Sequence, residues 1–265
     1  MSIQNEPNAI QTWESCYYTP ESEAEFIEKY LAPALDEEAM PNVKIIIWDH
    51  NKERIYDRAK TILSNEKINE RVWAVGHHWY SGDHFDGLRL VYEQLNKPTI
   101  CTEICAPIAA TKSLISLAER YGREICENLN NYNIATCDWN LLLNGYGGPY
   151  HNRSTSGGEP AVTFKDHKAG CYAPIMYYEK EHRMEITPIY YYIGHFSKYI
   201  KRGARRIATT KYTDMLSVCA FMNPNGEKVA VIMNMSGEEL PAVIRLNGKC
   251  TRIITEAHSI MTILF

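Results

Sequence analysis

The sequence lacks any apolar run near the length of about 20 residues that a membrane-spanning helix needs. Its start has no basic-then-apolar segment of the kind that directs secretion. Long basic runs are missing too, and the net charge is −4, so nucleic acid and anionic membranes are poor candidate partners. What remains, with 45% hydrophobic and 23% charged residues over 265 positions, is typical of a globular protein with one large domain or two smaller ones.

Cysteine pairs with the CxxC spacing are also absent. No histidine lies close enough to complete a zinc-binding pattern, so we expect no metal ion. The simplest interpretation is a set of thiols in a reducing compartment, which favours the cytoplasm. The eight cysteines stand at positions 16, 101, 105, 126, 137, 171, 219 and 250.

Phenylalanine is scarce among the aromatic residues, with 6 Phe against 18 Tyr and 5 Trp. Aromatic rings with a polar tip are suited to stacking on sugar rings. They are equally suited to the core and rim of an ordinary domain, so both interpretations stay open for most of these side chains.

Up to about residue 200 the sequence alternates short apolar runs rich in β-branched residues with helical patterns. Thr19, Pro20 and the acidic residues after them predict the start of a first helix that runs to about residue 35. Residues 145–188 are predicted to be a long irregular stretch, which is unusual unless functional. The predicted strands are a stub ending at residue 6, then 43–49, 72–80, 99–104 and 134–140, and the further predicted helices are 53–63, 85–95, 111–128 and 190–199.

Polar or aromatic residues end each of these predicted strands, which is typical of an α/β fold of the (β/α) barrel kind. From Arg205 onward the pattern changes to short alternating strands with turn signals between them, including Asn223-Pro224-Asn225-Gly226. We therefore predict the C-terminal part of a (β/α)8 TIM barrel, about strands 4 to 8, over residues 1–203. A small antiparallel β-sandwich module is predicted over residues 204–265.

Two carboxylates stand at the ends of predicted strands in this barrel part. Glu6 follows the opening stub and precedes Pro7, which cannot continue a strand ladder, and Glu103 ends the run 99–104. In a closed barrel these would be strands 4 and 7, which face each other across the mouth. A pair of this kind cleaves glycosidic bonds, so we predict Glu6 as acid/base and Glu103 as nucleophile of a retaining glycosidase, with carboxyl groups about 5–5.5 Å apart. Glu6 is expected to have the higher pKa of the two.

Several further motifs, in order along the chain, resemble those of glycoside hydrolase family 30, and specifically its glucosylceramidase-like branch. The resemblance covers nearly the whole chain and implies a retaining β-glycosidase. It rests on Gln4-Asn5-Glu6-Pro7, Trp48-Asp49, His78-Trp79-Tyr80, Thr102-Glu103, Asp138-Trp139-Asn140, Gly147-Gly148-Pro149 and Gly194-His195-Phe196-Ser197-Lys198.

The resemblance also implies roles for side chains around the two carboxylates. Asn5 corresponds to an asparagine that binds the sugar 2-hydroxyl, and Trp139 corresponds to a tryptophan against the bound sugar. His78 and Tyr80 are implied beside the nucleophile, and Asp49 near the catalytic pair. A family asparagine after the Gly-Gly-Pro motif has only a shifted counterpart in Asn152, and Cys105 matches a family cysteine position.

The family places about three and a half barrel strands before the Asn-Glu-Pro motif, so the chain resembles the C-terminal portion of such an enzyme. We expect a β-glycoside substrate, glucosyl or xylosyl with a lipid or oligosaccharide aglycone, and no cofactor. A complementing N-terminal chain or a second copy of this chain is the expected partner. Two alternatives stay open: a β-1,6-glucanase or xylan-directed member of the same family, and a non-catalytic fragment or sugar-binding remnant.

Overall fold

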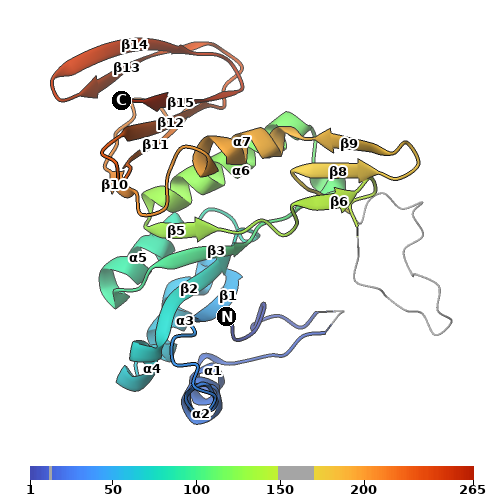
Figure 1. Ribbon diagram of the computed structural model, residues 1–265, viewed down its shortest axis with the longest axis vertical. Coiled ribbons are helices and arrows are strands. Elements are labelled where there is room, and N and C mark those ends of the chain that lie inside the picture. The colour runs from blue at the N-terminus through green and yellow to red at the C-terminus, as the bar shows by residue number, and fades with distance from the viewer. Residues whose placement is uncertain (12–13, 149–169) are drawn as a thin grey trace. The chain divides into compact units, whose positions relative to one another are not determined.

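The computed structural model describes residues 1–11, 14–148 and 170–265 (Figure 1). Its contacts divide the described chain into two compact units. The first contains Met1–Ile104 and Asn131–Trp139, and the second contains Cys105–Asn130, 140–148 and 170–265.

The first unit is built on a parallel sheet with the strand order β1-β2-β3-β5. Ser2 forms an isolated parallel bridge with Ile46 of β1, so the predicted opening stub lies beside the first full strand. The predicted strand order along the chain is therefore the order in the sheet, as a (β/α) barrel requires. The bounds of the strands are Ile45–Asn51 (β1), Val72–His78 (β2), Thr99–Glu103 (β3) and Asn133–Thr136 (β5).

Helices follow the strands of this unit as the sequence predicts. The first begins where Thr19 and Ser22 form a reciprocal capping box, which satisfies backbone donors that the first turn leaves unpaired. It runs through a π-helical turn before it ends, and a short helix, α4, that the sequence analysis missed precedes β2. The bounds are Pro20–Phe26 (α1), Ile27–Leu31 (π turn), Ala32–Glu37 (α2), Lys52–Arg54 (3-10 turn), Ile55–Ile62 (α3), Glu66–Arg71 (α4) and Phe85–Leu95 (α5).

The core of the first unit lies between this sheet and the helices α3 and α5. Strand β1 contributes a nearly continuous apolar run, which is typical of a parallel strand covered on both faces. This packing fixes the carboxyl ends of β1, β2 and β3, where the polar residues begin. Fully buried members of the core are Ile45, Ile47, Ile55, Ala59, Ile62, Val75, Leu88 and Val91.

The second unit contains two longer helices, Leu114–Asn130 (α6) and Pro188–Ser197 (α7), which contact each other. A short 3-10 turn at Ile108–Ala110 precedes α6. In the part of the chain that the structure describes, no helix is long and apolar enough to cross a bilayer. The core around α6 and α7 includes Ile125, Cys126, Phe196, Cys219 and Phe221.

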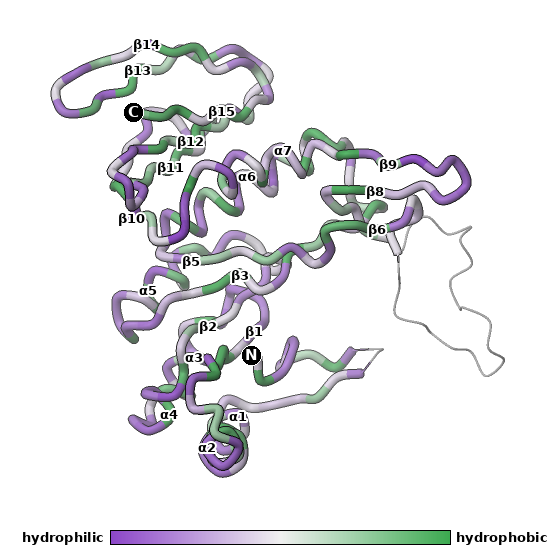
Figure 2. The backbone as a smooth tube through the Cα atoms, viewed as in Figure 1, coloured by the Kyte–Doolittle hydropathy of each residue, from purple (hydrophilic) through white to green (hydrophobic). Residues whose placement is uncertain are grey.

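The prediction of an irregular stretch over 145–188 is wrong for its described end, which contains three strands. Strand β4 (Ala106–Pro107) pairs with β7 (Cys171–Tyr172), and β6 (Leu142–Asn144) pairs with β8 (Ile175–Tyr178). Strand β9 (Arg183–Ile186) pairs with β8 and forms an edge of the β6-β8-β9 sheet, and the turn that joins the two strands is hydrophilic (Figure 2). These strands have two to four residues each, too few to show a period of two in the sequence.

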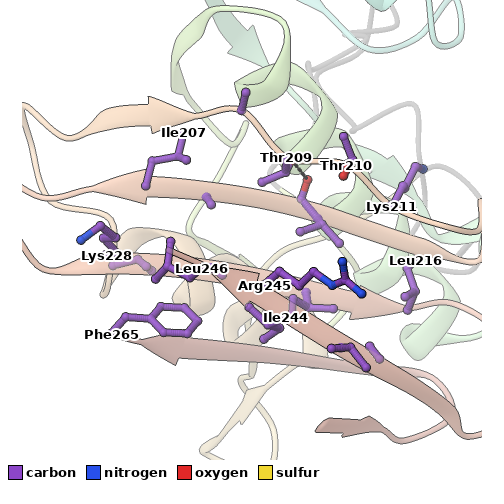
Figure 3. Close-up of a pocket in the computed structure, with 18 of the residues that line it drawn as sticks. Ile207, Thr209, Thr210, Lys211, Leu216, Lys228, Ile244, Arg245, Leu246 and Phe265 are labelled. Carbon is purple, nitrogen blue, oxygen red and sulfur yellow. Dashed lines mark hydrogen bonds between the residues drawn. The ribbon is translucent and has the colours of Figure 1, made fainter. Parts of the chain in front are cut away.

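The antiparallel strands predicted after Arg205 are all present. A sheet with the order β10-β11-β12-β15 and a separate β13–β14 hairpin form this part. The two sheets enclose a pocket of about 450 Å³ lined by side chains of both, among them Ile207, Ile244 and Phe265 (Figure 3). The bounds are Arg205–Ile207 (β10), Leu216–Met222 (β11), Lys228–Asn234 (β12), Leu240–Leu246 (β13), Lys249–Thr255 (β14) and Ser259–Leu264 (β15).

Candidate active site

The site begins where the backbone at the end of β1 leaves regular strand geometry. Trp48 and Asp49 both have positive φ, at 71° and 51°, and the pairing of β1 with β2 shifts register between Trp48 and His50. Glu6 also has a positive φ of 50°, and its N–H donates to the carbonyl of Asp49 at 3.0 Å. Such conformations are rare outside glycine and gather at functional sites.

Asp49 is the acceptor that joins three elements of the first unit. Its carboxylate accepts from the hydroxyl of Ser2 at 2.5 Å, from Nε2 of His78 at 3.0 Å, and from the hydroxyl of Thr102. Burial by itself raises the pKa of Asp49, but these three hydrogen bonds lower it below its usual value. Asp49 is therefore an ionised, almost fully buried anchor.

His78 lies between two carboxylates. Its Nε2 contacts Asp49, and its Nδ1 lies 3.5 Å from Oε1 of Glu6, an ion-pair distance at the long limit of hydrogen bonding. Burial lowers the pKa of His78, but the bonds to Asp49 and Glu6 and the charge of Glu103 outweigh it and raise the pKa to about 9. The imidazole is consequently a cation at neutral pH, shared by these carboxylates.

Glu6 receives further contacts from Gln11, whose amide donates to Oε2, and from His50, whose Nδ1 lies 4.0 Å from Oε1. The close contact with the His78 imidazole is the largest influence and lowers the pKa of Glu6, although burial opposes it. The sequence-based expectation of a high pKa at Glu6 differs from this result. It considered repulsion from Glu103 and desolvation, but not the histidine cation that stands beside Glu6.

Glu103 ends β3 opposite His78, its register partner on β2. The hydroxyl of Tyr80 donates to Oε1 of Glu103 at 2.8 Å. Tyr80 is itself positioned by Asn51, whose side-chain oxygen accepts from the Tyr80 N–H at 3.0 Å. Asn51 ends β1 and Tyr80 follows the neighbouring parallel strand β2, so the adjacent strand ends hold the donor against the carboxylate.

His77 precedes His78 but has the opposite character, because successive strand residues point to opposite faces. It is fully buried, its Nε2 contacts Oδ1 of Asn133 at 3.1 Å, and burial lowers its pKa to about 3. One histidine of the pair is thus a neutral core residue and the other a charged site residue.

Two predicted site residues, Asn5 and Trp139, have no described side-chain contact with this network. Asn5 is exposed, and its carbonyl accepts from the Gln4 side chain. Trp139 is half-buried and is held beside the end of β3 by a bond from its N–H to the carbonyl of Ile104 at 2.9 Å. Asn152 lies outside the described residues. The structure therefore brings together Glu6, Asp49, His78, Tyr80 and Glu103, while no described contact joins the side chains of Asn5 and Trp139 to them.

Sequence reasoning missed four residues that contact the carboxylates. The polar run Asp49-His50-Asn51 directly after an apolar strand was a usable signal for His50. Thr102 stands in the Thr102-Glu103 motif, but its bond to Asp49 was not predicted, and Ser2 and Gln11 carried no signal because polar residues near strand ends and in loops are common.

Two family models match this chain. The model described as the glycosyl hydrolase family 30 TIM-barrel domain matches residues 1–200, and the model described as the family 30 beta sandwich domain matches residues 203–263. The chain belongs to glycosyl hydrolase family 30. This membership confirms the predicted fold class, a partial TIM barrel followed by a β-sandwich, and the assignment to the glycoside hydrolases.

Relatives with similar sequences agree with the family assignment. Putative glucosylceramidase 3 of Caenorhabditis elegans is 28% identical over 79% of this chain and 40% of its own length. Lysosomal acid glucosylceramidase of Mus musculus is 27% identical over 88% of this chain and 45% of its own length. The chain thus spans about two fifths of the length of the curated family 30 relatives it matches.

Solved structures support the same fold. SrfJ from Salmonella typhimurium matches with a TM-score of 0.89 and 30% identity, over all of this chain and 56% of its own. An endo-β1,6-glucanase matches with a TM-score of 0.81 and 22% identity, over 98% of this chain and 57% of its own. The second likeness is one of fold alone.

Proposed function

We propose that this chain carries the catalytic pair of a retaining β-glycosidase, with Glu6 as acid/base and Glu103 as nucleophile. The observation that carries the proposal is the placement of both carboxylates around one buried cation, His78. Glu6 lies 3.5 Å from it, and the charge of Glu103 contributes to its raised pKa. Family 30 membership supplies the reaction class, and this arrangement supplies the candidate residues.

The proposed reaction has two displacements. Glu103 attacks the anomeric carbon while Glu6 donates its proton to the leaving glycosidic oxygen, and a glycosyl ester forms on Glu103. Glu6 then removes a proton from water, which hydrolyses the ester with net retention of configuration. The two carboxyl groups supply the acid, the base and the nucleophile, so the chemistry needs no cofactor.

The charges around Glu6 suit one of these steps better than the other. The His78 cation favours the ionised carboxylate, which is the form required when Glu6 acts as base in the second step. The first step requires the proton on Glu6. Bound substrate supplies that condition by excluding water from the site, because desolvation raises a carboxyl pKa.

Tyr80 acts on the proposed nucleophile, as His78 acts on the proposed acid/base. Its hydroxyl donates to Oε1 of Glu103 and so orients the attacking carboxylate before substrate binds. As negative charge leaves Glu103 on ester formation, this bond weakens, which makes Tyr80 a positioning residue whose effect falls on the nucleophile.

For the substrate we propose a β-glucoside, with a lipid aglycone. The sequence relatives named above are called glucosylceramidases, and the chain matches them over most of its own length. A β-1,6-glucan or xylan substrate is the alternative from the same family.

The first experiment compares hydrolysis of aryl β-glucoside and aryl β-xyloside by this chain and by its Glu6→Gln and Glu103→Gln variants. Both variants are expected to lose activity by at least about a thousandfold, because each removes a group that forms or breaks a bond in the transition state. Glu93→Gln, an exposed carboxylate on α5, is the matched control and keeps full activity.

A 2-deoxy-2-fluoro glycoside tests the nucleophile separately, because it traps the glycosyl ester. The label is expected on Glu103, and wild-type turnover followed by NMR is expected to release the β-anomer first. A label on another residue, or activity retained in Glu103→Gln, would contradict the assignment. Sugar binding without turnover in the wild-type chain would instead support the non-catalytic alternative.

A further inference from the structure

Cys105 and Cys171 lie close together at the ends of two paired strands, and we propose that they form a redox-active dithiol that a low-molecular-weight disulfide oxidises to an intramolecular disulfide. Their Sγ atoms are 2.8 Å apart, with one thiol donating to the other. A disulfide has an S–S length of about 2.05 Å, so the sulfur atoms need to approach by less than about 1 Å. This inference does not depend on the proposed catalytic roles.

The backbones that carry the two cysteines are already held together. Strand β4 begins directly after Cys105, and β7 begins at Cys171, with Pro107 and Cys171 as register partners. The N–H of Ile108 donates to the carbonyl of Gly170 at 2.7 Å. Closing the bond therefore requires little further ordering of the chain.

Gly147 fixes Cys171 from its other side. The Cys171 N–H donates to the carbonyl of Gly147 at 3.1 Å, and Gly147 has a φ of +80°. A Cβ at position 147 would stand only 2.4 Å from the Cys171 nitrogen and oxygen, so only glycine permits this approach. The thiol of Cys171 is thus presented from a backbone with contacts on both sides.

Access distinguishes this pair from the thiols of Cys126 and Cys219, which also contact each other. Those two are 1% and 0% exposed within an apolar core, and the hydrogen bond with Cys219, together with burial, raises the pKa of Cys126 well above its usual range. A buried thiol of high pKa is inert to a dissolved oxidant. Cys105 and Cys171 are both partly exposed, so a small disulfide can reach them.

The oxidation is a pair of thiol–disulfide exchanges. The thiolate of one cysteine attacks a sulfur atom of the small disulfide, which forms a mixed disulfide and releases one small thiolate. The second cysteine thiolate then attacks the protein sulfur and releases the second small thiolate. In total the two cysteines lose two electrons to the small disulfide, and their two protons end on the two released small thiols.

The new bond would join positions 66 residues apart in the chain, from the segment that follows Glu103 by two residues to the start of β7. Crosslinks that close long loops restrict the unfolded chain strongly. Oxidation is therefore expected to raise the melting temperature by several degrees, and reduction is expected to reverse the change.

The test begins with fully reduced chain, which is incubated with excess oxidised glutathione, alkylated and digested without reduction. Mass spectrometry is expected to find the peptide that contains Cys171 linked to the one that contains Cys105. Because trypsin does not cleave the Lys97–Pro98 bond, residues 90–112 form one tryptic peptide that also contains Cys101, and a second cleavage after Glu103 separates Cys101 from Cys105.

Single variants assign the bond. Cys105→Ser and Cys171→Ser are each expected to abolish the linked peptide and the rise in melting temperature, while Cys250→Ser, at an exposed cysteine on β14, keeps both. Glutathione adducts on Cys105 or Cys171 without a crosslink would overturn the proposal, as would alkylation of both thiols after oxidation. The wild-type measurement decides the question even if a serine variant fails to fold.

Discussion

At the scale of single residues, a cation surrounded by carboxylates organises the candidate site. His78 is fully buried, Asp49 is almost fully buried and Glu6 is partly buried. An isolated charge in such a place would lose its proton or gain one, but the three charges compensate one another. The pKa of His78 rises to about 9 while the pKa values of Glu6 and Asp49 fall. The stability that His78 contributes is present in full below pH 6.5 and is lost as the pH rises through about 9.

Replacement of this cation by a neutral side chain is the first prediction. His78→Gln leaves Glu6 and Asp49 without the cation between them, so we expect a loss of about 3 kcal/mol in the free energy of unfolding at pH 7, measured by urea denaturation. His258→Gln is the control, because His258 pairs with Glu119 at 2.9 Å but is half-exposed, and little change is expected there. Equal stability losses in the two variants would contradict this compensation of charges.

The same variant gives a kinetic result. If Glu6 is the acid, the alkaline limb of the pH dependence of kcat/KM reports loss of its proton. Without the neighbouring cation the ionised form is less favoured, so this limb is expected to move to higher pH in the residual activity of His78→Gln. A limb that stays in place would separate Glu6 from His78 in the reaction.

Tyr80→Phe is the second prediction. The change removes one O–H donor to Glu103 and keeps the ring, so kcat/KM is expected to fall about tenfold to a hundredfold, in line with a charged hydrogen bond of about 1.5–3 kcal/mol. The melting temperature is expected to change little, because Tyr80 is 39% exposed. Tyr92→Phe removes a similarly exposed hydroxyl on α5 and serves as the control. An equal effect of both changes would remove Tyr80 from the site.

At the scale of elements, helix α1 supports the unusual end of strand β1. Glu23 on α1 accepts from the Trp48 N–H at 2.9 Å, and its other oxygen lies 3.7 Å from Arg58 on α3. Glu23 is 1% exposed, and burial raises its pKa to about 7 despite these contacts. One buried carboxyl therefore ties two helices to the turn that presents Asp49.

The third prediction concerns the pH dependence of the stability that Glu23 contributes. The pKa of Glu23 is higher in the folded chain than its ordinary 4.5, so the folded chain binds the proton more tightly than the unfolded one. The contribution of Glu23 to the free energy of unfolding is therefore largest below about pH 4.5. It is lost as the pH rises through about 7, by up to about 3 kcal/mol. Glu23→Gln keeps the acceptor for Trp48 and is expected to flatten the free energy of unfolding between pH 5 and 8, as measured with urea. A slope equal to that of the wild type would contradict the raised pKa, and Glu25→Gln, exposed on the same helix, is the control.

The elements themselves were largely predictable. Strands 72–80 and 99–104 and helix 85–95 were found within two residues, because apolar period and caps determine them locally. The turn at Trp48 and Asp49 was not predictable, because neither is glycine and the contact that holds it comes from Glu23, 25 residues earlier. The strands β7 to β9 were missed because they are short and depend on partners elsewhere in the chain.

The site was predictable to a different depth. Glu6 and Glu103 were predicted from strand ends, and Asp49, His78 and Tyr80 from the family resemblance, and the structure brings these five side chains together. The direction of the Glu6 pKa was missed, since it depends on a 3.5 Å contact with His78 that no spacing in the sequence reveals. The direction of a pKa shift depends on distances between side chains, which the sequence does not give. The ends of strands can be predicted from the residue pattern alone.

At the scale of the whole molecule, the parallel sheet of the first unit ends, within the described residues, at strands with open edges. β5 pairs with β3 alone, and the stub at Ser2 pairs with β1 through a single bridge. Unpaired edges are templates for another strand. The partner expected from the sequence, a complementing chain or a second copy, stays a prediction.

The fourth prediction follows from the exposed edge at β5. The chain is expected to self-associate as its concentration rises, measured by sedimentation velocity, and Ile134→Lys is expected to shift the population toward the monomer. Ile134 lies on β5 and is 52% exposed, and an added charge on an edge strand opposes strand pairing. Tyr191→Lys is the control, because Tyr191 is similarly exposed at 58% but lies on helix α7 and not on a sheet edge. An equal shift toward the monomer in both lysine variants would mean that added positive charge anywhere, and not this edge, opposes association. A monomer at all concentrations would mean that the edge is covered within the single chain.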